Sequence, residues 1–283
     1  MIRFALGNLR FTVLDAGPLW LDGGAMFGVV PKVLWERERP PDGRNRIRLA
    51  MNVMLVEDGT RRILVDTGAG SKLDEKQQRI YGIDPKTPAE VLSPAGIAPE
   101  EIDLVVSTHL HFDHAGGHTL RDARGEVVPA FPNAAYAVQR RELEVARWGN
   151  ERTRASYFPE DFEPLAREGR LRLLDGDTAL TPALSVRVAP GHTPGHQAIL
   201  VATGEGTVAF LSDLVPTSSH VRYPYIMAYD LEPLVSLATK KRFLPQAARE
   251  RWRVVFQHDA AVPLGTIEES GGTLRVRPGA GEA

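Results

Sequence analysis

The chain has 283 residues, of which 43% are hydrophobic and 25% are charged, and its formal net charge is −2. This composition is typical of a globular protein, and the balanced charge lacks the excess of basic residues that favours binding to nucleic acid or to an anionic membrane. The absence of cysteine excludes a disulfide scaffold, a thiolate metal site and a thiol nucleophile. Because the start lacks the apolar core of a signal peptide and no apolar run could cross a bilayer, we expect a cytoplasmic protein.

The N-terminal part is expected to open with a strand within residues 1–20 that leads into the turn at Gly17-Pro18. Residues 21–46 contain glycines and prolines that interrupt any regular element, yet the stretch from Met26 to Trp35 is largely apolar. A loop with this much apolar surface has to bury it. We expect it to cover the core, to form the wall of a substrate pocket, or to contact a second copy in a homodimer.

Two strands are predicted at residues 48–56 and 62–66, separated by the hairpin signal Asp58-Gly59. The second strand ends in VDTGAG, which places the carboxylate of Asp66 on a tight turn. Short helices are expected at residues 72–81 and 87–93. The apolar run in DLVVSTH, residues 103–109, then predicts a short buried strand.

The next segment, THLHFDHAGG at residues 108–117, is the motif around which the rest of the chain is organised. It holds four potential metal ligands, His109, His111, Asp113 and His114. Imidazole nitrogens and carboxylate oxygens are ligands that Zn²⁺ prefers, and one short turn could present them to two metal ions. The alternative is a polar loop that is simply rich in histidine.

After this motif the succession of strands and helices repeats. A strand at residues 134–138 and a helix at 139–148 precede a polar segment, 150–168, that we interpret as an insertion or lid. Further strands are predicted at 171–174, 184–189, 197–202, 207–212, 253–257 and 273–276, and an amphipathic helix at 232–249. Residues 1–283 are expected to form a single domain with two halves.

Three of these strands end in residues that could join the same site. His192 lies in APGHTPGH after a strand, Asp213 ends the run 208–212, and His258 ends the run 254–257. One polar residue at a strand end is often only a solvated strand end, but functional groups also gather there. Three such residues beside a four-ligand motif favour a shared metal site.

Together these residues resemble the ligand set of the metallo-β-lactamase superfamily of hydrolases. The resemblance implies an α/β fold, a four-layer αβ/βα sandwich of two mixed β-sheets flanked by helices, with a two-metal site at one edge. One metal would be bound by His109, His111 and His192, the other by Asp113, His114 and His258, with Asp213 bridging both. Zn²⁺ is the expected metal, and Fe, Mn or Co would also suit these ligands.

The resemblance also implies how the site works. A hydroxide held between the two metals would attack the substrate, and Asp113 would carry the proton to the leaving group. Asp66 matches the first motif of the superfamily and is expected to accept an N–H from a ligand histidine. His196 is expected either to contact and orient a ligand residue without binding metal itself, or to have a structural role only.

Two longer segments, Asp22–Trp35 and Ile226–Pro233, resemble YtnP-like quorum-quenching lactonases. This implies a small ester or lactone substrate, such as an acyl-homoserine lactone. Related chains hydrolyse organophosphate triesters, so a phosphotriester or phosphodiester hydrolase is the alternative. A glutathione-thioester hydrolase and a non-catalytic metal-binding module are less favoured. Zinc β-lactamases carry Cys where Asp213 stands, which argues against antibiotic hydrolysis.

One position departs from the lactonase pattern. The smaller acyl-homoserine lactonases place a Tyr three residues after the bridging Asp, where this chain has Pro216. Candidates that could take over from the same loop are His220, Tyr223 and Tyr225. Met26 and Phe27 are further candidates for the pocket wall.

Overall fold

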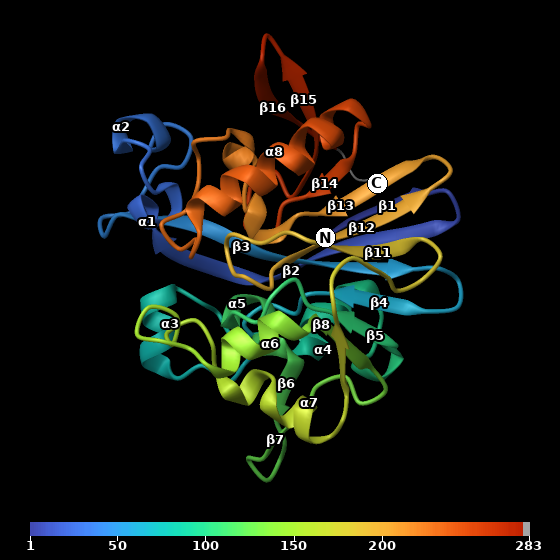
Figure 1. The fold of residues 1–283 in the computed structure, drawn as a ribbon. Helices are drawn as coiled ribbons and strands as arrows, with labels where there is room; N and C mark the ends of the chain where they lie inside the picture. The colour runs from blue at the N-terminus through green and yellow to red at the C-terminus, as the bar shows by residue number, and fades with distance from the viewer. Residues whose placement is uncertain (280–283) are drawn as a thin grey trace.

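The computed structural model describes residues 1–279, which form two seven-stranded mixed sheets packed face to face (Figure 1). The first sheet has the order β1-β2-β3-β4-β5-β8-β9. Its strands are β1 (Ile2–Leu6), β2 (Leu9–Asp22), β3 (Arg46–Glu57), β4 (Arg62–Val65), β5 (Leu104–Val106), β8 (Ala135–Gln139) and β9 (Leu171–Leu174). Strands β4, β5, β8 and β9 run parallel, and the others pair antiparallel.

The second sheet follows the order of the chain from β10 to β16. Its strands are β10 (Thr178–Ala179), β11 (Leu184–Val188), β12 (Gln197–Thr203), β13 (Gly206–Phe210), β14 (Arg253–Val255), β15 (Leu264–Ser270) and β16 (Thr273–Pro278). Only the pair β13 and β14 is parallel. A separate hairpin joins β6 (Thr119–Arg121) to β7 (Val127–Pro129).

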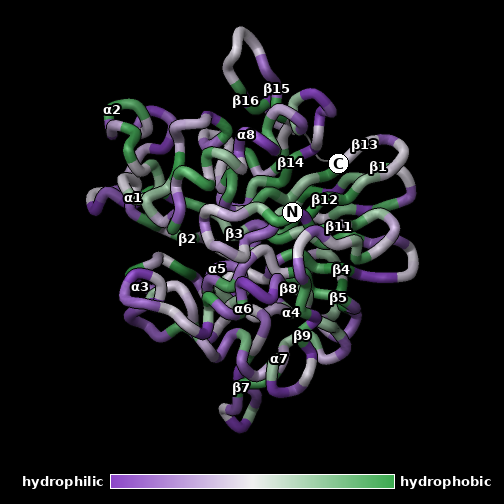
Figure 2. Tube along the Cα trace, viewed as in Figure 1, coloured by the Kyte–Doolittle hydropathy of each residue, from purple (hydrophilic) through white to green (hydrophobic). Residues whose placement is uncertain are grey.

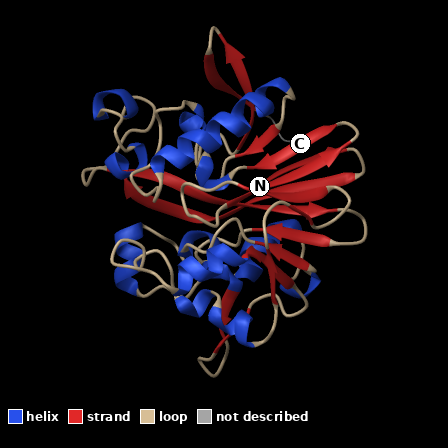
Figure 3. Cartoon of the chain, viewed as in Figure 1, coloured by secondary structure: helices blue, strands red, loops and turns tan. Residues whose placement is uncertain are grey.

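Helices cover the outer faces of the two sheets, which confirms the four-layer arrangement (Figure 3). The α-helices are α1 (Gly23–Phe27), α2 (Lys32–Trp35), α3 (Glu75–Tyr81), α4 (Pro88–Leu92), α5 (Phe112–Ala115), α6 (Arg140–Arg147), α7 (Glu163–Arg167) and α8 (Pro233–Arg249). The 3₁₀ turns are η1 (Ser93–Ala95), η2 (Pro99–Glu101), η3 (Gly116–His118), η4 (Pro159–Asp161), η5 (Ser212–Leu214) and η6 (Ser218–Val221). Among residues 1–279, no helix combines the length and apolar composition that a bilayer crossing requires.

The core lies between the sheets and between each sheet and its helices. On β3, Val53 and Leu55 join the cluster under the helices of the first sheet, whereas Met54 and Val56 face the second sheet. A strand buried on both faces reads as a continuous apolar run. This is why residues 48–56 were recognisable as a strand, and why green dominates the central strands in Figure 2.

Two N-terminal predictions need correction. The expected opening strand is a hairpin, and β2 continues through Gly17 and Pro18 to Asp22, because a bulge between Asp15 and Pro18 absorbs the turn residues. The apolar segment that was expected to lack regular structure contains the short helices α1 and α2. The Asp22 side chain caps α1 by accepting from Ala25 N at 2.8 Å.

The topology brings four strand ends to one edge. Because β4 and β5 are parallel, and β13 and β14 are parallel, the carboxyl ends of each pair meet. The polar residues that follow these strands are Asp66, the segment 107–114, Asp213 and His258. The fold therefore collects the predicted ligands from distant parts of the chain.

Candidate active site

Two of the loops that carry the ligands are held in strained backbone conformations. Asp66 follows β4 with φ 55° and Ser212 precedes Asp213 with φ 48°, both in the left-handed region that non-glycine residues avoid. Such strain persists only where surrounding contacts enforce it, and it concentrates at functional sites. The Ser212 hydroxyl lies 3.0 Å from Thr108 Oγ1 and donates to Gln257 Oε1 at 3.2 Å.

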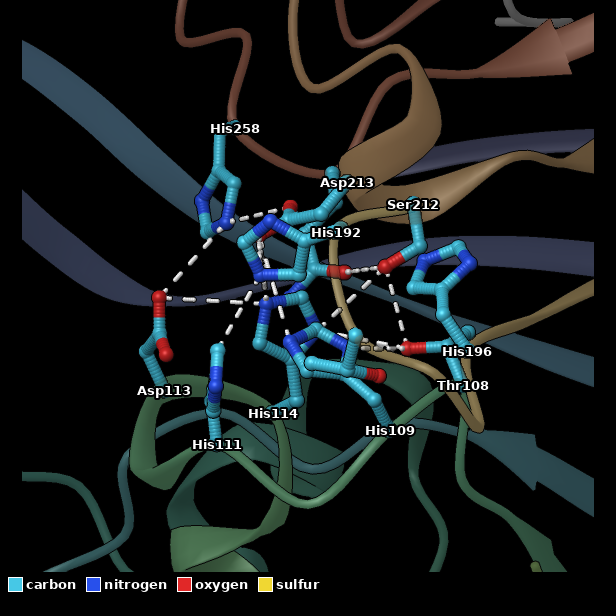
Figure 4. Close-up of polar contacts among 12 residues, drawn as sticks. Thr108, His109, His111, Asp113, His114, His192, His196, Ser212, Asp213 and His258 are labelled. Carbon is cyan, nitrogen blue, oxygen red and sulfur yellow. Dashed lines mark hydrogen bonds and ion pairs between the residues drawn. The ribbon is translucent and has the colours of Figure 1, made fainter. Parts of the chain in front are cut away.

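Asp213 occupies the centre of the cluster, with four imidazoles around its carboxylate (Figure 4). Its Oδ2 lies 3.1 Å from His192 Nε2, 3.6 Å from His114 Nε2 and 3.9 Å from His109 Nε2, and its Oδ1 lies 3.1 Å from His258 Nε2. This central position is the one expected for a ligand shared by two metals.

The two remaining predicted ligands, Asp113 and His111, also lie in this cluster. Asp113 Oδ2 lies 3.6 Å from His258 Nε2 and 3.8 Å from His114 Nε2. His111 Nδ1 lies 3.1 Å from His192 Nε2. The structure thus brings all seven predicted ligands together. Potential ligand atoms lie within 4.8 Å of one another in three groups, His109–His111–His192, His109–His114–Asp213 and Asp113–His114–His258.

The free atoms of the cluster fit bound metal ions. His109 Nε2 and His114 Nε2 are buried and have no hydrogen-bond partner among residues 1–279. Buried polar atoms without a partner are costly unless they coordinate a metal. The donor set of imidazoles and carboxylates suits divalent zinc or a related ion.

Burial and the neighbouring charges shift the pKa values of the candidate ligands in two directions. Burial and the neighbouring His114 hold the pKa of His109 well below its usual range, and burial and His192 do the same for His111. Burial opposes ionisation of Asp213, but His192 and His258 hold the pKa of its carboxyl well below the usual value. Burial also opposes the charged forms of His114, His192 and His258, but the carboxylate of Asp213 outweighs this effect and raises the pKa of all three imidazoles. A metal ion that binds these nitrogens would displace their protons, so metal binding is expected to be coupled to proton release.

Asp66 makes the contact that the sequence predicted for it. Fully buried, it accepts from His114 Nδ1 at 3.0 Å and from the backbone and hydroxyl of Thr108, each at 2.7 Å. His258 Nδ1 donates to Ala50 O at 2.8 Å. These bonds leave Nε2 of both candidate ligand histidines pointing into the cluster and fix their orientation.

Asp230 accepts a hydrogen bond from His192 as Asp66 does from His114, and the sequence did not predict this contact. Its Oδ1 accepts from His192 Nδ1 at 3.0 Å, and the residue is 4% exposed. It lies in the loop before α8, neither at a strand end nor in a ligand motif. The only signal was its place in the segment Ile226–Pro233 that resembled lactonases.

The two other histidines near the motif make supporting contacts. His196 Nδ1 donates to Ala189 O at 3.0 Å, which closes the loop that carries His192, and its ring centroid lies 5.3 Å from that of His109. His118 Nε2 lies 3.2 Å from Ser107 Oγ. Burial lowers the pKa of each of these two imidazoles to about 3, so both are neutral.

A cavity of about 360 Å³ opens onto the ligand cluster. The cluster contributes His111, Asp113, His192, Asp213 and His258. The apolar walls consist of Leu21, Ala25, Met26, Tyr81, Phe112, Met227, Tyr229 and Leu231. The segment 150–168 adds Arg152, Thr153, Ala155 and Ser156. The cavity therefore joins a polar floor to walls that suit an apolar chain.

Of the five predicted pocket residues, only Met26 lines this cavity. Phe27 is fully buried because it stacks between Trp35 and His220, with centroids 5.3 and 4.9 Å away. His220 accepts from Thr217 Oγ1 at 2.7 Å and donates to Met26 O at 2.8 Å, so its ring faces the core.

The two predicted tyrosines also lie elsewhere. Tyr225 packs edge-on against Phe27 and accepts from Arg222 Nη1 at 2.7 Å. Tyr223 packs on the hydrophobic cluster beneath α8. Instead, Tyr81 and Tyr229 supply the phenol groups of the cavity wall.

Residues 47–258 match the profile of the metallo-beta-lactamase superfamily. An N-acyl homoserine lactonase from Bacillus cereus is 30% identical over 228 residues, 76% of this chain and 83% of that protein. A probable metal-dependent hydrolase from Staphylococcus aureus superposes with a TM-score of 0.88 at 29% identity, covering 97% of this chain and 99% of that one.

A solved N-acyl homoserine lactone hydrolase, with N-hexanoyl-L-homoserine bound at its catalytic metal centre, superposes with a TM-score of 0.69 at 25% identity. The superposition covers 88% of this chain and 93% of the solved one. The profile match spans the loops from before Asp66 to His258, which are the loops that assemble the ligand cluster. The chain therefore belongs to the metallo-beta-lactamase superfamily.

Proposed function

We propose that the protein is a dinuclear metal-dependent hydrolase that opens the ring of N-acyl homoserine lactones. The observation that carries this proposal is the position of the ligand cluster at the polar floor of a cavity with apolar walls. Relatives named N-acyl homoserine lactonases support the substrate class. The expected attack by a hydroxide between two metals belongs to the same proposal.

Bound metal ions would lower the pKa of water and polarise the lactone carbonyl. Asp113 lies on the cavity floor, with its carboxylate between His114 and His258, where it can accept a proton and return it to the leaving alcohol. Asp66 and Asp230 hold His114 and His192 in the tautomer that presents Nε2 to the cluster. The apolar walls would receive the acyl chain and exclude water.

Tyr229 is our candidate for the phenol that is missing at Pro216. It lines the cavity with 37% of its surface exposed, and partial burial together with Asp22, Tyr81 and Asp113 raises its pKa to about 12. The phenol is therefore protonated at neutral pH and can donate to a carbonyl oxygen. Pro216 instead accepts from His258 N at 2.9 Å through its own carbonyl.

Several finer features remain predictions. Zn²⁺ is the expected metal because the donors are imidazoles and carboxylates, although Fe, Mn or Co accept the same set. The segment 150–168 would act as a lid, which its four cavity-lining residues support. A single domain, a cytoplasmic location and a homodimer are likewise proposals from the sequence.

Ring opening of N-hexanoyl-homoserine lactone by the purified, zinc-loaded chain tests the proposed function. We expect turnover that is lost in His111→Ala, because this substitution removes a ligand from the floor of the cavity. A chain that hydrolyses paraoxon-type triesters but opens no lactone would contradict the substrate class and support the phosphotriesterase alternative.

A further inference from the structure

Glu142, on α6, is a buried acidic residue outside the ligand cluster. It is 0% exposed, and no Lys or Arg within residues 1–279 forms an ion pair with it. Burial raises the pKa of this carboxyl, and the hydrogen bonds that it accepts oppose the rise. A carboxylate in such a place is costly, so its partners indicate what it stabilises.

The carboxylate of Glu142 accepts three hydrogen bonds from three different segments. Its Oε1 accepts from Leu110 N at 3.0 Å and from Tyr157 Oη at 2.9 Å, and its Oε2 accepts from Thr193 Oγ1 at 2.6 Å. No two of these donors are close together in the sequence. One side chain therefore ties together the motif loop, the segment 150–168 and the loop after β11.

Each donor lies directly beside a ligand. Leu110 separates His109 from His111, and Thr193 follows His192. The ring of Tyr157 packs edge-on against that of His111, with centroids 4.6 Å apart. All three ligands belong to one group of potential metal donors, His109–His111–His192.

The other group is held by different bonds. His114 donates to Asp66, and His258 donates to Ala50 O, and neither contact involves Glu142. Helix α6, which carries Glu142, also packs closely on the loop that carries His192, a ligand of the first group only. A Cβ on Gly195 would lie 2.3 Å from Glu142 N, so the helix backbone rests directly on the loop.

We propose that Glu142 is a positioning residue for one of the two metals, the one held by His109, His111 and His192. It acts through Leu110, Thr193 and Tyr157 and touches neither metal nor substrate. The inference rests on the proposed dinuclear site, but it concerns metal affinity and does not depend on the substrate.

Zinc affinity, measured by competition with a chromophoric chelator, tests this in two backgrounds. His258→Ala weakens the other group and leaves the His109–His111–His192 group to bind. His111→Ala does the reverse. Adding Glu142→Ala should weaken zinc binding about 10–100-fold in the first background. It should leave affinity in the second background nearly unchanged.

Two further variants separate positioning from general loss of structure. Glu142→Gln can still accept from Leu110 and Tyr157 and can donate to Thr193, so it should restore most of the lost affinity. Leu184→Ala removes a buried side chain of β11 away from these contacts and controls for lower stability. Should Glu142→Ala fail to fold, Thr193→Val removes one of the three bonds and should weaken the same background selectively.

Equal weakening in both backgrounds, or none in either, would overturn the role of Glu142. A wild-type chain that binds no metal would overturn this role and the proposed function together. A chain that binds two zinc ions but opens no lactone would overturn only the substrate assignment and would leave the Glu142 test intact.

Discussion

We propose two roles for Asp113, metal ligation and proton transfer, because it lies among the potential ligands and also faces the cavity. Asp113→Asn keeps the size of the side chain but removes its ability to take up a proton at neutral pH. We expect kcat for lactone opening to fall about 10²–10⁴-fold, the usual contribution of a general acid–base group. Metal content, measured in the same samples, separates lost proton transfer from lost ligation. A variant with full metal content and wild-type kcat would contradict the role.

Asp230 gives a sharper test of ligand orientation, since it contacts His192 and lies outside the cluster of ligands. Asp230→Asn replaces the acceptor for His192 Nδ1 with an amide that can present its NH₂ group there. We expect zinc affinity to fall about 10–100-fold, as for other partners of ligand histidines. Asp177→Asn, at an exposed position that pairs with Arg187, is the control and should bind zinc as the wild type does. Unchanged affinity in Asp230→Asn would show that the contact does not orient His192.

His220 should make the fold sensitive to acid. Burial lowers its pKa to about 3, whereas an unfolded chain titrates near 6.5. Between these values the unfolded chain binds a proton that the folded chain does not, so stability falls as the pH falls, by about 1.4 kcal/mol per pH unit. In His220→Gln this contribution is absent. The variant should be less stable than the wild type at pH 7.5, and the difference should narrow toward pH 5.

Urea denaturation of the metal-free proteins at pH 7.5, 6 and 5 measures this difference without interference from metal loss. Parallel curves of unfolding free energy against pH would contradict the assignment. His220 also illustrates a limit of the sequence, from which it was only one of several candidates for the substrate pocket. An imidazole in a polar loop predicts function or structure equally well until its partners, here Thr217 and Met26, are known.

The candidate ligands were predictable because four of them fall within six residues and three more follow apolar strands. Glu142 and Asp230 were not, because a carboxylate on a helix or in a loop has no local pattern that separates it from a solvated one. Their function arises from contacts with residues far away in the chain. Phe27 was predicted for the pocket wall but lies in the core. A residue in an apolar segment can equally well line a pocket or fill the core, and the local sequence does not distinguish the two.

At the level of elements, the contact between α6 and the His192 loop depends on a residue without a side chain. A Cβ on Gly195 would lie within 2.6 Å of three atoms of Glu142. Gly195→Ala should therefore force the loop away from the helix, cost about 1–3 kcal/mol of stability and lower zinc affinity. Gly204→Ala is a matched control, because nothing lies within 4 Å of its Cβ position. Equal stability of the two variants in urea would contradict the close fit.

Most elements were predicted because their strands are buried and apolar. β15 was missed because its sequence, LGTIEES, is polar over the half that pairs with β16 near the tip of a hairpin. The turn predicted at Gly17-Pro18 is absent because pairing with β3 continues on both sides of the bulge. In both cases a neighbouring strand decides the structure, and local sequence does not encode that neighbour.

At the level of the whole molecule, the ligand cluster joins the two sheets. His109, His111, Asp113 and His114 follow β5 of the first sheet, whereas His192, Asp213 and His258 follow strands of the second. The resemblance to a known family predicted this arrangement, while periodicity alone indicated only two halves. Bound metals would therefore crosslink the halves as well as serve the chemistry.

Removal of the metals should accordingly lower the stability of the entire fold. Each site that is filled at 100 times its Kd contributes about 2.7 kcal/mol, so two sites contribute about 5 kcal/mol. For a chain of this size that corresponds to a fall in Tm of roughly 10–20 °C. Calorimetry with excess zinc, with a chelator, and with zinc restored after chelation measures the shift and its reversal. His111→Ala should show a smaller shift than the wild type, because it lacks one ligand of the crosslink. An unchanged Tm after complete chelation would show that the sheets are held by their apolar interface alone.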